Sequence, residues 1–176
     1  MALLVTHLAA ATAAVVWMLV EMSLHGKASA LGIATGAVAG LVAITPASGT
    51  VGPLGAIVIG AASALACFYF ATKVKHQFGY DDSLDVFGVH GIGGIVGALL
   101  TGVFAAKQFG GSEDIVVSTQ VIAQAKSLVV TSVWSGVVSI VAFRLVDLLV
   151  GMRVPIEVER GGLDVSEHQE QAYEIV

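Results

Sequence analysis

Long apolar runs separated by short polar segments constrain this chain more than any other feature of its sequence. We predict membrane-spanning helices at about residues 2–24, 28–44, 53–73, 84–106 and 115–150. A helix needs about 20 mostly apolar residues to cross the hydrocarbon core of a bilayer. The predicted fold class is therefore all-α, a polytopic bundle of transmembrane helices.

The composition agrees with a membrane protein. Hydrophobic residues make up 56% of the 176 residues and charged residues 12%, whereas a soluble domain carries about 25% charged residues. The single cysteine, Cys67, excludes a disulfide framework within the chain. No basic patch is present, so nucleic-acid binding is not expected.

The polar residues predict the limits and the orientation of the spans. Residues 115–150 would extend for about 54 Å as a helix, so this last span should tilt or protrude. Residues 151–176 form an acidic tail outside the bundle of residues 1–150. The basic residues that fall on the tail side of the predicted spans are Lys27, Lys73, Lys75 and Arg153. The positive-inside rule therefore predicts a plasma or inner membrane protein with a cytoplasmic C-terminus.

One stretch, DVFGVHGIGGIVGALLTGVF (85–104), holds a histidine, His90, inside an apolar run. An ionisable side chain at membrane depth is costly and indicates a functional site. Helical spacing places Gly93, Gly94 and Gly97 on the side of His90, and Phe87 one turn before it. Such a surface fits a narrow pore or a tightly packed neighbouring helix, where the histidine would only form a hydrogen bond. No second ligand lies three or four residues away, so no metal site is predicted.

The other motifs favour structural roles. Asp85 and the Asp81-Asp82-Ser83 cluster stand before this span, where carboxylates can cap free N–H groups. Gly32, Gly36 and Gly40 repeat every fourth residue, which is typical of close helix packing. The sequence contains no phosphate-binding loop, nucleophile elbow or pair of catalytic carboxylates. We therefore expect neither an enzyme nor a cofactor.

Several stretches together resemble the ammonium transporter (Amt/Mep/Rh) family, specifically its C-terminal half. They are HLAAATAAVVWMLVE (7–21), HGKASALGIATGAVAGLVAITPASGTVGPLGA (25–56), DDSLDVFGVHGIGGIVGALLTGVFA (81–105), VWSGVV (133–138) and RVPIEVERGGLDVSEHQEQAY (153–173). The resemblance implies a bundle of eleven helices, built from two inverted repeats of five helices and a long last helix. It also implies a homotrimer with one hydrophobic pore in each protomer. This chain would supply the last five helices and the tail.

The resemblance also implies roles for individual residues. His90, in FGVHG, matches one of the family's two pore histidines, Phe87 is a lesser candidate for the pore wall, and Asp85 supports the helix. The other histidine, the outer aromatic recruitment site and its carboxylate belong to helices that precede this chain in the family. The tail would couple subunits and meet a PII-type signalling protein. Its candidate residues are Arg153, Asp164, His168, Glu170 and Tyr173.

One departure concerns the tail, where the family usually has His-Gly-Glu and this chain has His168-Gln169-Glu170. A glycine there can serve a special backbone angle, so the tail turn is in question. The predicted function is the passage of ammonium or ammonia through a hydrophobic pore, by a partial chain that needs an N-terminal half. The alternatives are an ammonium-sensing component and an inactive structural fragment.

Overall fold

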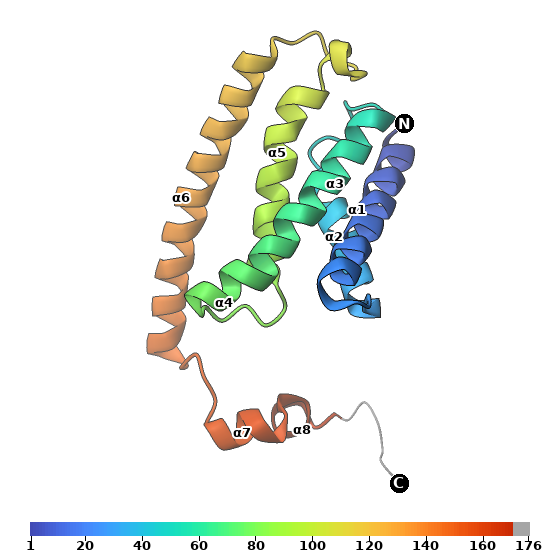
Figure 1. The fold of residues 1–176 in the computed structure, drawn as a ribbon. Helices are drawn as coiled ribbons and strands as arrows, with labels where there is room; N and C mark the ends of the chain where they lie inside the picture. Colours follow the sequence, from blue (N-terminus) through green and yellow to red (C-terminus); the bar gives the residue numbers. More distant parts are fainter. Residues whose placement is uncertain (171–176) are drawn as a thin grey trace. The chain divides into compact units, whose positions relative to one another are not determined.

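The computed structural model describes residues 1–170, and its regular elements there are all helical, which confirms the all-α fold. The helices are α1 (Ala2–His25), α2 (Ala30–Ile44), α3 (Pro53–Tyr69), α4 (Lys75–Phe78), α5 (Ile92–Phe104), α6 (Val117–Leu149), α7 (Ile156–Gly161) and α8 (Leu163–His168) (Figure 1). Two π-helical segments, η1 (Phe70–Val74) and η2 (Val86–Gly91), adjoin α4 and α5, and a short 3-10 helix, η3 (Lys107–Phe109), follows α5.

The helices differ in how well they fit a bilayer. Within residues 1–170, four helical stretches are long and apolar enough to cross a membrane: Ala2–His25, Pro53–Phe78, Val86–Phe104 and Val117–Leu149. The predicted span at 28–44 is a shorter apolar helix of 15 residues, Ala30–Ile44. It extends for about 22 Å, less than the roughly 30 Å of a hydrocarbon core. Ser29 caps its start, and its side chain accepts a hydrogen bond from the Gly32 N–H.

The third predicted span, 53–73, ends later than predicted. Pro53 begins α3 at a position where its missing N–H costs nothing. The helix then passes through η1 into α4 and stops at Phe78, followed by Gly79 with a φ of 62°. The positive φ suits a glycine and ends the helix in a left-handed turn.

The chain divides into two compact units, residues 1–129 and 130–176, with the division inside α6. In the first unit, α1 packs against α2 and α3, and α5 packs against the same two helices. The second unit contains the C-terminal part of α6 together with α7 and α8. The predicted boundary between bundle and tail at residue 150 stays a prediction.

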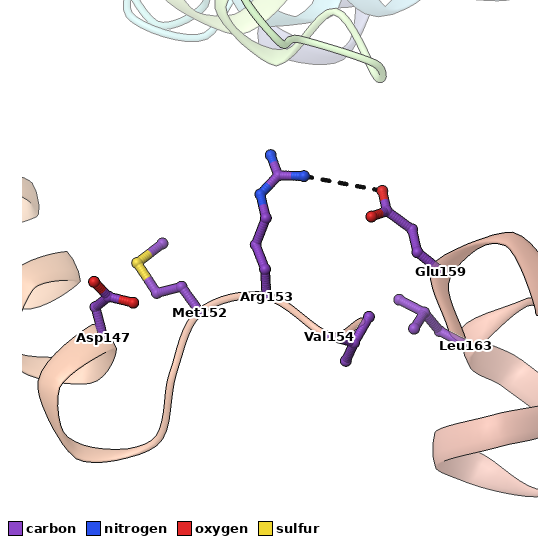
Figure 2. Close-up of a pocket in the computed structure, with 6 residues that line it drawn as sticks. All are labelled: Asp147, Met152, Arg153, Val154, Glu159 and Leu163. Atoms are coloured by element: carbon purple, nitrogen blue, oxygen red, sulfur yellow. Dashed lines mark ion pairs between the residues drawn. The ribbon is translucent and has the colours of Figure 1, made fainter. Parts of the chain in front are cut away.

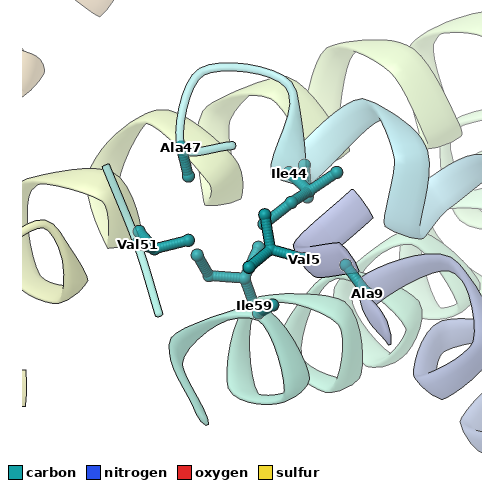
Figure 3. Packing of buried hydrophobic residues seen from close by; sticks show 8 residues of the cluster. Val5, Ala9, Ile44, Ala47, Val51 and Ile59 are labelled. Atoms are coloured by element: carbon teal, nitrogen blue, oxygen red, sulfur yellow. The ribbon is translucent and has the colours of Figure 1, made fainter. Parts of the chain in front are cut away.

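Small side chains allow the helices of the first unit to approach closely. A Cβ on Gly36 would lie 2.5 Å from the Trp17 Cβ, and one on Gly40 would lie 2.7 Å from the Ala13 Cβ. The predicted packing role of the glycine repeat in α2 is therefore confirmed. Figure 3 shows the adjacent apolar core, in which eight buried residues meet: Val5, Ala9, Ala43, Ile44, Ala47, Val51, Ala56 and Ile59.

A second buried cluster lies against η2. Its members are Trp17, Ala39, Cys67, Phe68, Ala71, Val89 and Ile92. The Trp17 and Phe68 rings meet edge to face, with centroids 5.2 Å apart. This cluster joins α1, α2 and α3 to the segment that carries His90.

The turn between α1 and α2 is organised by Glu21. Its carboxylate accepts hydrogen bonds from the Ser29 N–H at 2.8 Å and from the Ser29 Oγ at 3.2 Å. The Trp17 Nε1–H also donates to it, at 3.4 Å. The acidic side chain at this end of α1 is therefore already occupied by partners within the chain.

Candidate functional site

His90 lies near the end of η2, where the chain changes from a π-helical segment into α5. Its side chain is exposed, whereas the neighbouring Gly88 and Val89 are buried. Among residues 1–170, no hydrogen bond or ion pair involves the His90 imidazole. The bundle therefore holds the backbone beside His90 but leaves its imidazole free to contact something else.

Aromatic rings line the same segment. Phe87 is 49% exposed and meets two other rings edge to face: Phe70, with centroids 6.5 Å apart, and Tyr80, with centroids 6.0 Å apart. The Tyr80 hydroxyl is buried without a hydrogen-bond partner in the described part of the chain. Phe87 has the exposure that a pore wall needs, but that role stays a prediction.

The start of η2 is capped by Asp82, one of the carboxylates expected there, and the expectation of a cap is corrected only for Asp85. The Asp82 carboxylate accepts hydrogen bonds from the N–H groups of Val86, Phe87 and Gly88 at 2.7, 3.0 and 3.2 Å. Asp85 has a left-handed backbone, with a φ of 53°, and its side chain makes no capping hydrogen bond. Three carboxylates, Asp81, Asp82 and Asp85, lie near the predicted helix start, and the sequence does not show which of them the backbone directs toward the free N–H groups.

Asp85 instead holds the end of the preceding helix. The Lys75 Nζ lies 2.6 Å from an Asp85 carboxylate oxygen and also donates to the Asp82 carbonyl at 2.8 Å. Both side chains are partly shielded, with 25% and 32% of their surface exposed. Asp85 therefore supports the loop between α4 and η2 as an ion pair.

The glycines after His90 lie on two different faces, which corrects the expectation of one glycine-lined groove. A Cβ on Gly93 would lie 3.2 Å from Val42 and 3.4 Å from the Cys67 Sγ, and one on Gly97 would collide with the Ala43 carbonyl oxygen. Only Gly94 faces open space. Gly93 and Gly97 are four residues apart in α5 and share one face, whereas Gly94 is turned by about 100° from Gly93.

A buried polar chain, which the sequence analysis did not identify, connects η2 to the bundle. The Ser63 Oγ donates to the Ala39 carbonyl at 2.8 Å and lies 3.6 Å from the Cys67 Sγ. The Cys67 thiol donates to the Val89 carbonyl at 3.5 Å. Ser63 and Cys67 are four residues apart, a spacing that places both on one face of α3.

We expect Asp82→Ala to lower the free energy of unfolding by about 2 kcal/mol, because it removes three charge-assisted hydrogen bonds at a partly exposed helix start. The fully buried Cys67 is the only cysteine, so its maleimide labelling during a titration with sodium dodecyl sulfate measures unfolding of this unit. Asp114→Ala is the control, since that side chain is 93% exposed and its ion pair with Lys107 is weak. Equal effects of the two substitutions would contradict the capping role.

The predicted tail residues lie in the second unit. Figure 2 shows Arg153 and Glu159, whose charged groups are 3.9 Å apart, beside a pocket of about 580 Å³. The pocket is lined by Asp147, Met152, Arg153, Val154, Glu159 and Leu163. Arg153 thus takes part in a local polar contact at the junction between α6 and α7.

The turn after α8 contains a residue with the positive φ that a glycine usually adopts. Gln169 has a φ of 55°, in the left-handed region that favours glycine, and its N–H donates to the Asp164 carbonyl. The Glu170 N–H donates to the same carbonyl at 2.9 Å, and His168 ends the helix. The turn is therefore present although glutamine replaces glycine, at a cost of about 1 kcal/mol. The fifth predicted tail residue, Tyr173, lies outside the described residues.

The four helical stretches within residues 1–170 that are long and apolar enough to cross a membrane define a class: a multi-pass α-helical membrane protein. The comparison with known families is more specific. The model of the Ammonium Transporter Family matches residues 1–173, and the chain belongs to that family.

Curated relatives match almost the whole chain in sequence. An ammonium transporter of Aquifex aeolicus is 44% identical over 99% of this chain and 41% of its own length. An ammonium transporter of Bacillus subtilis is 39% identical over 96% of this chain and 43% of its own length. The chain therefore spans about two fifths of the length of these relatives, which are transporters and not enzymes.

Solved structures share the fold. The crystal structure of Candida albicans Mep2 matches 89% of this chain and 36% of its own chain, with a TM-score of 0.79 and 33% identity. A structure described as a sensor Amt protein matches 94% of this chain and 41% of its own, with a TM-score of 0.85 and 30% identity. The arrangement of apolar helices is thus that of Amt and Mep proteins.

Proposed function

We propose that this chain supplies the C-terminal half of a pore for ammonium or ammonia, with His90 facing the pore. The observation that carries the proposal is the free imidazole of His90, which is exposed although Gly88 and Val89 directly before it are buried. A histidine that served packing alone would find its hydrogen-bond partner within the bundle. Family membership supports ammonium as the substrate.

The chemistry of an imidazole suits this substrate. Ammonium must lose its charge or its solvation shell to pass an apolar constriction, and both steps need a hydrogen-bonding group at that point. An imidazole can donate from one ring nitrogen and accept at the other, and it titrates near neutral pH. Ammonium would be recruited outside and deprotonated, and ammonia would pass the histidines while the proton is carried separately. The second histidine of the pair would come from the N-terminal half.

The proposal includes an assembly. The complete protein would be a homotrimer in the plasma or inner membrane with a cytoplasmic C-terminus. The basic residues Lys27, Lys73, Lys75 and Arg153 support this orientation through the positive-inside rule. The tail, with Arg153, Asp164, His168, Glu170 and Tyr173, would couple subunits and meet a PII-type protein.

Uptake of radiolabelled methylammonium in a bacterial strain that lacks ammonium transporters tests the proposal. The chain is expressed alone or together with the N-terminal three fifths of the Aquifex aeolicus relative. We expect uptake above background only when both parts are present, because the chain alone would expose the free surface around His90 to lipid.

The outcomes separate three functions. Strong uptake by the chain alone would contradict the need for an N-terminal half. No uptake by the pair, while the intact Aquifex aeolicus transporter is active in the same strain, would contradict transport. A pair that binds methylammonium without moving it would instead identify a sensing component.

A further inference from the structure

A pocket on the first unit is lined by groups that can donate hydrogen bonds to an anion. It has a volume of about 480 Å³, within the range of small-molecule sites. Leu24 and His25 reach it from α1, and the other lining residues are Phe68 from α3, Thr72 and Lys73 from η1, and His76 from α4. The pocket therefore lies where the ends of two candidate membrane spans meet.

The nitrogen groups of this pocket have no interaction partner among the described residues. Within residues 1–170, the side chains of His25, Lys73 and His76 take part in no hydrogen bond or ion pair. The carboxylates that lie near these helix ends in the sequence have other partners. Glu21 accepts hydrogen bonds from Ser29 and Trp17, Asp81 from Ser83 and Asp82 from the N–H groups of η2, and Asp85 pairs with Lys75. No carboxylate lines the pocket itself. A negatively charged ligand would supply the missing partner.

The rest of the lining is apolar, which distinguishes the pocket from a site for a free anion. Leu24 is 57% exposed, and Phe68, a member of the buried cluster around Trp17, also lines the pocket. Tyr69, the next residue in α3, is 50% exposed and has the amphipathic character typical of the membrane interface. Hydrogen-bond donors that lie beside an apolar surface, at the end of membrane spans, can bind the headgroup of a lipid while the apolar surface contacts its upper acyl chain.

We propose that this pocket binds the phosphate of an anionic phospholipid, with Lys73 as the charged contact and His25 and His76 as further donors. The lipid chain would lie against Leu24 and Phe68. The proposal needs the chain to be in a membrane, but it does not depend on transport of ammonium.

Tryptophan quenching by brominated lipids tests the site. Trp17 touches Phe68 and is only 4% exposed, so it reports on the pocket, and Trp134→Phe removes the second tryptophan. The chain is placed in nanodiscs of phosphatidylcholine with increasing fractions of brominated phosphatidylglycerol or brominated phosphatidylcholine. We expect quenching to saturate at a lower fraction of brominated phosphatidylglycerol than of brominated phosphatidylcholine. Lys73→Gln should raise that half-saturating fraction about fivefold, the effect of one charge near an anionic surface.

Two further variants make the test specific. Lys27→Gln removes a charge from the loop after α1 without changing the pocket, and it should leave the half-saturating fraction unchanged. His25→Gln with His76→Gln retains Lys73 and should produce a smaller loss than Lys73→Gln. Low labelling of Cys67 shows that each variant is folded.

Three results would overturn the proposal. Equal quenching by the two brominated lipids would exclude selectivity for an anionic headgroup. An equal loss in Lys27→Gln and Lys73→Gln would assign the effect to general surface charge. Displacement of the lipid by inorganic phosphate, or by a peptide of residues 153–170, would assign the pocket to a soluble anion or to the acidic tail.

Discussion

Replacing His90 with alanine is expected to lower methylammonium uptake by the paired chains at least about tenfold. The physical reason is the loss of a hydrogen-bonding group where the permeating molecule has no water. One hydrogen bond to a charged group contributes about 1.5–3 kcal/mol, and 1.36 kcal/mol corresponds to a factor of ten. Because the His90 side chain is exposed and has no partner within residues 1–170, the substitution should leave the fold of the chain intact.

Two variants give this prediction its controls. His90→Gln replaces the imidazole with an amide, which donates and accepts hydrogen bonds but cannot titrate. This variant should retain more uptake than His90→Ala if hydrogen bonding dominates, and it should retain none if proton transfer is essential. His7→Ala removes an exposed histidine of α1 that lies outside the proposed pore, and it should have no effect. Full uptake by His90→Ala with low Cys67 labelling would contradict the role of His90.

Much of the fold could be predicted because it depends on hydropathy and on small residues. The apolar runs predicted the limits of α1, of the continuous stretch formed by η2 and α5, and of α6 to within a few residues. The repeat of Gly32, Gly36 and Gly40 predicted which face of α2 packs closely. Hydropathy also indicated the histidine in the apolar run as a site residue, because ionisable side chains are rare in membrane spans.

The details of the site could not be predicted, because they depend on where the helix period changes. A π-helical segment leaves no simple mark in a sequence, yet η2 changes the phase between His90 and the glycines of α5. The choice between Asp82 and Asp85 as the capping residue could not be predicted either. Only the backbone conformation decides which of the two carboxylates reaches the free N–H groups.

Gly97→Ala is expected to destabilise the chain by at least about 3 kcal/mol. The new Cβ would collide with the Ala43 carbonyl oxygen and approach the Ala43 Cα to 2.7 Å, and these backbone atoms cannot move away as a flexible side chain can. The helices α2 and α5 would have to separate, which places the cost at the upper end of that for overpacked cores. Labelling of Cys67 should begin at a lower concentration of sodium dodecyl sulfate, because Ser63 and Cys67 of α3 lie beside Gly93, one turn before Gly97 on α5.

Gly94→Ala is the matched control, since it lies on α5 three residues earlier and its Cβ would meet open space. Both substitutions gain about 0.5–1 kcal/mol from the higher helix propensity of alanine, so their difference isolates the collision. We expect Gly94→Ala to be neutral or slightly stabilising in the isolated chain. If Gly97→Ala were equally well tolerated, α2 and α5 would not be in contact at Ala43, and the face assigned to His90 and Gly94 would have to be revised. The pair of variants thus tests the packing of α5 and the free surface beside His90 in one measurement.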